Sequence, residues 1–133
     1  MARIVIADDE KDNFLLLKEA LAQCCPEAEE VDWVQNGEEL LDYLKTKPRP
    51  TLVLLDLFMP RLNGYEALVQ IKEDKELADL PVLVLSLAGR GAEILKAYRL
   101  EAPYIQKPTG NMEFKHFITQ FKKYWTETIQ NPA

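Results

Sequence analysis

Short apolar runs alternate along the chain with longer segments whose apolar positions recur at helical spacing. Four of these runs fall at residues 3–8, 51–56, 82–86 and 103–106. Their length and branching are typical of strands that are buried on both faces of a parallel sheet. A fifth segment, residues 30–34, alternates charged and apolar residues, which predicts a half-exposed strand at a sheet edge.

The segments between the strands predict helices. Three of them are bounded at residues 12–24, 92–99 and 111–128. Another begins after Asn36, which stands three residues before Glu39 in the spacing of a helix cap and its N3 partner. The remaining helix begins after Asn63-Gly64. Strands that alternate with helices predict βαβ units around a parallel sheet with helices on both faces.

The last predicted helix carries one apolar stripe. Its members are Phe114, Phe117, Ile118, Phe121, Tyr124 and Trp125. Packing against the sheet is the favoured interpretation of this stripe, ahead of a cofactor site. Tyr124 and Trp125 at its far edge could extend past the sheet and contact a partner. Five β/α repeats account for all 133 residues, so we expect one domain over 1–133, with a core of about 3–128 and no output module.

Composition narrows the functional classes. The chain is 47% hydrophobic and 29% charged, with a formal net charge of −6. An acidic balance argues against sequence-independent binding to nucleic acid or to anionic membranes. No apolar stretch approaches the roughly 20 residues of a membrane span, and the start of the chain does not resemble a signal peptide, so we expect a cytoplasmic protein. The adjacent Cys24 and Cys25 are interpreted as partly buried core residues.

Chemically active residues stand at the carboxyl ends of the predicted strands. Asp8 ends the first strand and Asp9 follows it, Asp56 ends the third, Ser86 ends the fourth, and Lys107 follows the fifth. The carboxyl ends of parallel strands form the ligand crevice of an open sheet, so these side chains should share one pocket. Two carboxylates 4 Å apart repel by about 4 kcal/mol at an effective dielectric constant of 20, so such a cluster needs a cation. Clustered carboxylates suit a hard divalent ion, and Mg²⁺ is the expected one.

Such a pocket suits phosphoryl transfer. An aspartate carboxylate is a known nucleophile toward phosphoryl groups, which predicts Asp56 as acceptor. Lys107 and Mg²⁺ would neutralise charge, and the hydroxyl of Ser86 could bind a phosphoryl oxygen. Because the carboxylate is ionised at neutral pH, the reaction needs no general base.

The ordered motifs resemble the receiver domain of two-component response regulators over essentially the whole chain. They comprise Asp8-Asp9, the segment Leu54-Leu55-Asp56-Leu57-Phe58-Met59-Pro60 with Asn63-Gly64, then Ser86, and finally Tyr104-Ile105-Gln106-Lys107-Pro108. The resemblance implies a flavodoxin-like, doubly wound (βα)5 fold with strand order 2-1-3-4-5. It also implies phosphorylation by a histidine kinase and no catalysis beyond the domain's own phosphorylation and dephosphorylation.

The resemblance assigns a role to each residue of the pocket. It implies that Asp56 is the phosphoacceptor and that Asp9, Asp56 and the backbone carbonyl of Phe58 bind Mg²⁺, with Asp8 acting largely through water. Lys107 would contact the phosphoryl group. Ser86 and Tyr104 would form the switch, with the ring of Tyr104 turning inward when Ser86 moves. The Lys107–Pro108 bond is expected to be cis.

A narrower resemblance links the chain to stand-alone regulators that are partnered with bacterial phytochrome kinases. It rests on Ala97-Tyr98-Arg99-Leu100 and on the end of the last helix, Phe121-Lys122-Lys123-Tyr124-Trp125. It implies homodimerisation through the face of the fourth helix, fifth strand and fifth helix. Leu87 and Phe58 depart from the family pattern, and we expect them to flank the acceptor and slow dephosphorylation.

Two alternatives stay open at the level of sequence. The first is a receiver-like scaffold that has lost phosphorylation, which the complete set of pocket residues argues against. The second is a phosphohydrolase of the haloacid dehalogenase type. That class carries a second aspartate two residues after the nucleophile, and here Phe58, which cannot transfer protons, stands at that position. His116, the only histidine, is expected to be an exposed helical residue.

Overall fold

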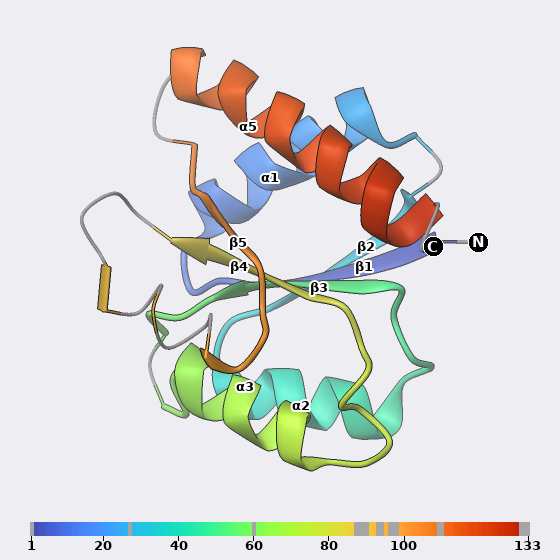
Figure 1. Ribbon diagram of the computed structural model, residues 1–133, viewed down its shortest axis with the longest axis vertical. Helices are drawn as coiled ribbons and strands as arrows, with labels where there is room; N and C mark the ends of the chain where they lie inside the picture. Colours follow the sequence, from blue (N-terminus) through green and yellow to red (C-terminus); the bar gives the residue numbers. More distant parts are fainter. Residues whose placement is uncertain are drawn as a thin grey trace.

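Five parallel strands form one sheet in the order β2-β1-β3-β4-β5 (Figure 1). The computed structural model describes residues 2–26, 28–59, 61–86, 91–92, 95, 99–108 and 111–130. The strands are β1 (Ala2–Ala7), β2 (Ala28–Val34), β3 (Leu52–Asp56), β4 (Val82–Ser86) and β5 (Tyr104–Gln106). The flavodoxin-like class and the strand order expected from the sequence are confirmed, and the alternating segment is indeed an edge strand.

Helices cover both faces of the sheet. They are α1 (Lys11–Cys24), α2 (Gly37–Thr46), α3 (Gly64–Glu73) and α5 (Asn111–Tyr124). Figure 1 shows α1 and α5 on one face and α2 and α3 on the other. Asn36 caps α2 as expected, because its side chain accepts a hydrogen bond of 2.9 Å from the backbone N–H of Glu39.

The structure changes the end of the last predicted helix and leaves the fourth predicted helix largely undescribed. The last one is α-helical only to Tyr124 and continues as a π-helix, η1 (Trp125–Gln130), so its predicted end at residue 128 is corrected. The predicted fourth helix, 92–99, falls largely outside the described residues.

The sheet separates two buried clusters, because successive strand residues point to opposite faces. Val5, Val53 and Val84 belong to the cluster beneath α2 and α3. Ile4, Leu54 and Leu85 belong to the cluster beneath α1 and α5. β1, β3 and β4 are therefore buried on both faces, as their continuous apolar runs predict. The same expectation is wrong for β5, which lies at the edge of the sheet and exposes Tyr104 and Gln106.

The apolar stripe of α5 packs into the second cluster, which confirms its interpretation as core. Phe121 stacks on Phe117 at 5.8 Å and on Trp125 at 6.1 Å between ring centroids. Trp125 is only 2% exposed, so the expectation that it extends past the sheet toward a partner is wrong. Tyr124 is half-buried, and burial raises its pKa to about 12. Cys25 is buried and Cys24 half-buried, in agreement with their interpretation as core residues.

Candidate functional site

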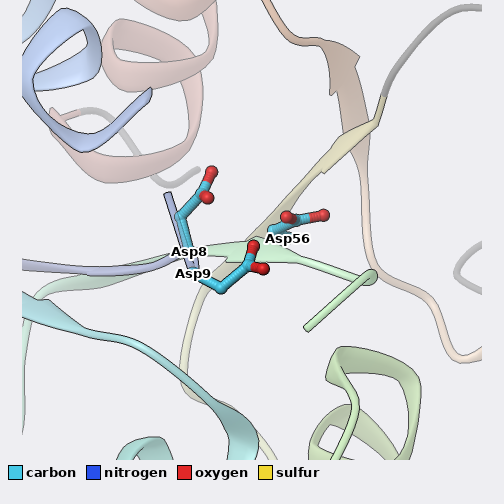
Figure 2. A group of neighbouring side chains, drawn as sticks. All are labelled: Asp8, Asp9 and Asp56. Carbon is cyan, nitrogen blue, oxygen red and sulfur yellow. The ribbon is translucent and has the colours of Figure 1, made fainter. Parts of the chain in front are cut away.

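Three carboxylates converge where β1 and β3 end. The two strands are neighbours, and their register pairs Ala7 with Leu55, so Asp8 and Asp56 follow at the same edge of the sheet. Figure 2 shows the side chains of Asp8, Asp9 and Asp56 projecting from these strand ends. One carboxylate oxygen of each lies within 4.8 Å of those of the other two. The convergence predicted from the parallel-sheet rule is confirmed.

Hydrogen bonds from β2 and from the following turn hold Asp8. Its backbone N–H donates to the carbonyl of Val34 at 3.0 Å, and its backbone carbonyl accepts from Trp33 Nε1 at 2.7 Å. Its Oδ1 accepts from the backbone N–H of Glu10 at 2.9 Å. Asp9, which is exposed, therefore lies within a fixed turn. The role of Trp33 was not found from sequence, because a single aromatic residue in an edge strand gives no signal of the carbonyl that it contacts.

Lys107 supplies the cation that the cluster needs. Its Nζ lies 2.9 Å from Asp56 Oδ2 and 3.0 Å from Asp8 Oδ2, and the residue is 6% exposed. No cis peptide bond occurs among the described residues, so the expected cis bond between Lys107 and Pro108 is wrong. The trans form is the one preferred by most X-Pro bonds, and with it the Lys107 ammonium contacts both Asp56 and Asp8.

Burial and the Lys107 ammonium together determine the pKa values of the site. Burial raises the pKa of Asp56, and this effect outweighs the neighbouring ammonium and the N–H of Phe58, which both lower it. Burial acts to lower the pKa of Lys107, yet attraction by Asp56 and Asp8 leaves that pKa above its ordinary value. Both groups therefore hold their protons more tightly than usual, Asp56 because burial disfavours the charged carboxylate and Lys107 because two carboxylates favour the charged ammonium.

The donor set fits a divalent metal ion. Within the described part of the chain, Asp8 Oδ2 is a buried oxygen that accepts no aligned hydrogen bond, although the Lys107 ammonium is close. A buried carboxylate oxygen with spare acceptor capacity, beside two further carboxylates, suits a hard oxygen-seeking cation. Phe58 stays beside the cluster because its backbone N–H donates to Asp56 Oδ1 at 2.9 Å. Phe58 as a whole is 44% exposed.

Gly64 allows α3 to begin directly against the acceptor strand. Its N–H donates to the carbonyl of Leu57 at 3.1 Å. A Cβ at this position would lie 2.6 Å from the Cα of Leu57 and 2.9 Å from the carbonyl carbon of Asp56. Glycine is therefore required here for close backbone approach. Sequence reasoning found Gly64 only as part of a motif, since the approach depends on how α3 crosses the sheet.

The expected switch residues lie at the other edge of the site. Ser86 ends β4 and pairs in register with Gln106, but its side chain lies outside the described part. Tyr104 begins β5 and is 45% exposed. Leu87 also falls outside the described residues, so its expected position beside the acceptor stays a prediction. His116 is exposed on α5, as expected.

Comparisons with known proteins agree on one family. A family model described as the response regulator receiver domain matches residues 4–119. Response regulator Rcp1 of Synechocystis is 27% identical over 137 residues, which cover 98% of this chain and 92% of that protein. A probable methanogenesis regulatory protein of Methanothrix harundinacea, FilR2, is 31% identical over 109 residues, which cover 77% of this chain and 70% of the relative.

Solved structures give the same result. The chain resembles the phosphorylated cyanobacterial phytochrome response regulator RcpA with a TM-score of 0.82 and 30% identity, over 96% of this chain and 95% of that one. It resembles the Mn²⁺-bound form of Rcp1 with a TM-score of 0.84 and 26% identity, over 100% of both chains. Across the part of the chain that the structure describes, no helix has the length and apolarity needed to cross a membrane.

Proposed function

The chain belongs to the response regulator receiver domain family, and we propose that it accepts a phosphoryl group on Asp56. The observation that carries this assignment is the position of Asp56 at the end of a buried strand. There one carboxylate oxygen contacts the Lys107 ammonium at 2.9 Å, and Asp8 and Asp9 stand beside it. A carboxylate between a fixed cation and a carboxylate cluster that suits a metal ion supports this proposal, because both cations would neutralise an incoming anionic group.

The proposed reaction is a simple displacement. An oxygen of the Asp56 carboxylate attacks the phosphorus atom of a phosphohistidine, the O–P bond forms, and the N–P bond breaks. The bonding electrons stay on the imidazole nitrogen, which leaves as neutral histidine after protonation. Asp8, Asp9, Asp56 and the Phe58 carbonyl would hold Mg²⁺, which neutralises charge on the phosphoryl oxygens. Lys107 would hold the ammonium on the opposite side, and Ser86 would donate its hydroxyl to a phosphoryl oxygen.

The output we propose is a changed protein surface. Phosphorylation adds charge and acceptor oxygens at Asp56. Ser86 would move toward them, and the ring of Tyr104, a residue that is 45% exposed, would turn inward. This shift of a pre-existing equilibrium would reshape the surface near β5 and α5. We propose that this surface governs homodimerisation.

The partner we propose is a sensor histidine kinase of the phytochrome type. The similarity to RcpA, a cyanobacterial phytochrome response regulator, supports this assignment. The acidic chain and the absence of a membrane-crossing helix from its described residues support a cytoplasmic protein that contacts neither membrane nor nucleic acid. We further propose that residues 1–133 form one receiver domain that catalyses only its own phosphorylation and dephosphorylation.

Phosphorylation by small donors tests the acceptor. Incubation with phosphoramidate or acetyl phosphate and Mg²⁺ should add the mass of one phosphoryl group to the wild-type chain. Asp56→Asn should abolish the gain. Asp12→Asn serves as the matched control, because Asp12 is an exposed carboxylate on α1. A wild-type chain that gains no mass, or an Asp56→Asn chain that gains as much as wild type, would overturn the proposal.

Sedimentation of the same samples tests the surface change. The phosphorylated wild type should show a dimerisation constant different from that of the unphosphorylated chain, whereas Asp56→Asn should show no response to the donor. Equal association of both wild-type forms would reject control of dimerisation, while leaving the acceptor assignment intact.

A further inference from the structure

Trp33 connects β2 to the turn that carries two of the three carboxylates. Its indole Nε1 donates to the backbone carbonyl of Asp8 at 2.7 Å. The next residue of β2, Val34, accepts from the backbone N–H of Asp8 at 3.0 Å. Both polar backbone groups of Asp8 are therefore bonded to the end of one strand.

A second contact fixes the plane of the indole. The ring of Trp33 stacks on that of Phe14 with 4.9 Å between centroids and 5° between planes. Phe14 belongs to the first turn of α1, and its backbone N–H donates to the carbonyl of Glu10 at 3.1 Å. The turn from Asp8 to Glu10 is thus held from the strand side and from the helix side.

Phe14 packs against the cluster beneath α1 and α5, but core packing does not account for the hydrogen bond of Trp33. Trp33 is half-buried, and neither apolar cluster of the described residues includes it. The indole has a single N–H donor, and its hydrogen bond to one backbone carbonyl fixes the orientation of that peptide. The peptide in question joins Asp8 to Asp9, so its orientation sets the direction in which both carboxylates leave the chain.

We propose that Trp33 is a positioning residue of the metal site. It acts through the Asp8–Asp9 peptide and holds the carboxylates in their binding arrangement before the ion arrives. Preorganisation of this kind lowers the entropic cost of binding. The inference rests on the divalent-metal site of the proposed function, and it adds a residue that contacts neither the ion nor the phosphoryl group.

The first test compares two substitutions in the full chain. Trp33→Phe removes the indole N–H and keeps an aromatic ring against Phe14. Phe14→Leu removes the stack and keeps the N–H. The dissociation constant for Mn²⁺, measured from the electron paramagnetic resonance signal of the free ion, should rise about three- to tenfold in Trp33→Phe, as expected for one lost hydrogen bond. It should rise less in Phe14→Leu.

Kinetics separate positioning from a general loss of structure. With acetyl phosphate as donor, Trp33→Phe should shift the Mg²⁺ concentration for half-maximal phosphorylation by the same factor and leave the rate at saturating Mg²⁺ unchanged. An unchanged Mn²⁺ constant in Trp33→Phe, or an equal rise in both variants, would overturn the proposal. If the wild type itself binds no Mn²⁺, the proposed metal site fails instead.

A measurement on the wild type needs no variant. The chain has two tryptophans, so its spectrum offers two indole N–H resonances. Titration with Mg²⁺ should move the Trp33 resonance and leave that of Trp125, which is buried beneath α5, in place. A Trp33 resonance that does not move at saturating Mg²⁺ would overturn the inference even if Trp33→Phe fails to fold.

Discussion

Replacement of Gly64 by alanine should disturb the acceptor although the residue carries no side chain. The added Cβ would lie 2.6 Å from the Cα of Leu57, about 0.8 Å short of the 3.4 Å at which ordinary contact begins. It would also contact the carbonyl carbon of Asp56 at 2.9 Å. Both neighbours are backbone atoms, so they cannot rotate away as a flexible side chain could.

The expected loss of stability in Gly64→Ala follows from this geometry. Overpacking of a close-packed site costs about 1–3 kcal/mol of unfolding free energy. For a domain of this size, that loss lowers the thermal midpoint by about 3–10 °C. The contact atoms belong to Asp56 and to the residue after it, so relief of the clash must move the acceptor. Misplacement of a reacting group by about 1 Å can slow a reaction about 100-fold, which sets the upper limit for slower phosphorylation.

The assay needs a second glycine as a control. Gly91 is suitable because a Cβ there would meet no heavy atom within 4 Å among the described residues. Thermal unfolding and the rate of phosphorylation by acetyl phosphate should both decline in Gly64→Ala and stay near wild type in Gly91→Ala. If Gly64→Ala keeps the midpoint and the rate of wild type, the close-approach argument is refuted.

Three further predictions concern charge and protonation. Lys107→Met leaves buried carboxylates without their cation. Denaturant unfolding in EDTA should therefore show a free energy of unfolding about 3–5 kcal/mol below that of wild type, and Mg²⁺ should restore part of it. Equal stability of the two chains in EDTA would contradict the ion-pair geometry. Mg²⁺ at 100 times its dissociation constant should stabilise the wild type by about 2.7 kcal/mol, measured by thermal unfolding. The stabilisation by Mg²⁺ should be smaller in Asp9→Asn, which lacks one of the three carboxylates. Burial and a 2.6 Å hydrogen bond to Asp32 raise the pKa of Tyr43 from 10.0 to about 12, so the folded chain holds this proton more tightly than the unfolded chain. The free energy of unfolding should therefore fall as pH rises from about 10 through about 12, and it should fall more steeply in wild type than in Tyr43→Phe. Denaturant unfolding at a series of pH values measures this, and parallel plots of stability against pH for the two chains would refute it.

The fold and the carboxylate cluster could be predicted because both follow from short-range sequence patterns. The run from Leu52 to Leu55 has no polar position, which is the pattern of a strand buried on both faces. Once the strands are parallel, their carboxyl ends must meet, and Asp8 and Asp56 are brought together without further information.

Other features depend on distances that no local pattern contains. The 2.7 Å contact between Trp33 and Asp8 joins residues 25 positions apart, and any long polar side chain in the edge strand would satisfy the same pattern. The stripe on α5 predicted which face is buried, but not that burial extends to Trp125, since periodicity does not tell where the sheet ends. The trans bond before Pro108 likewise depends on how β5 leads into the site.

The division of the interior by the sheet has an evolutionary consequence. Neighbouring residues of one strand, such as Val53 and Leu54, serve different clusters and share only their backbone. Substitutions more than about 7–10 Å apart and without shared partners combine almost additively. A lineage could therefore remodel the outer face of α5 toward a new partner while Phe14 of α1 keeps its stack on Trp33 and the layer of α2 and α3 keeps Gly64 against the acceptor strand. The sheet would let recognition diversify while the chemistry stays constant.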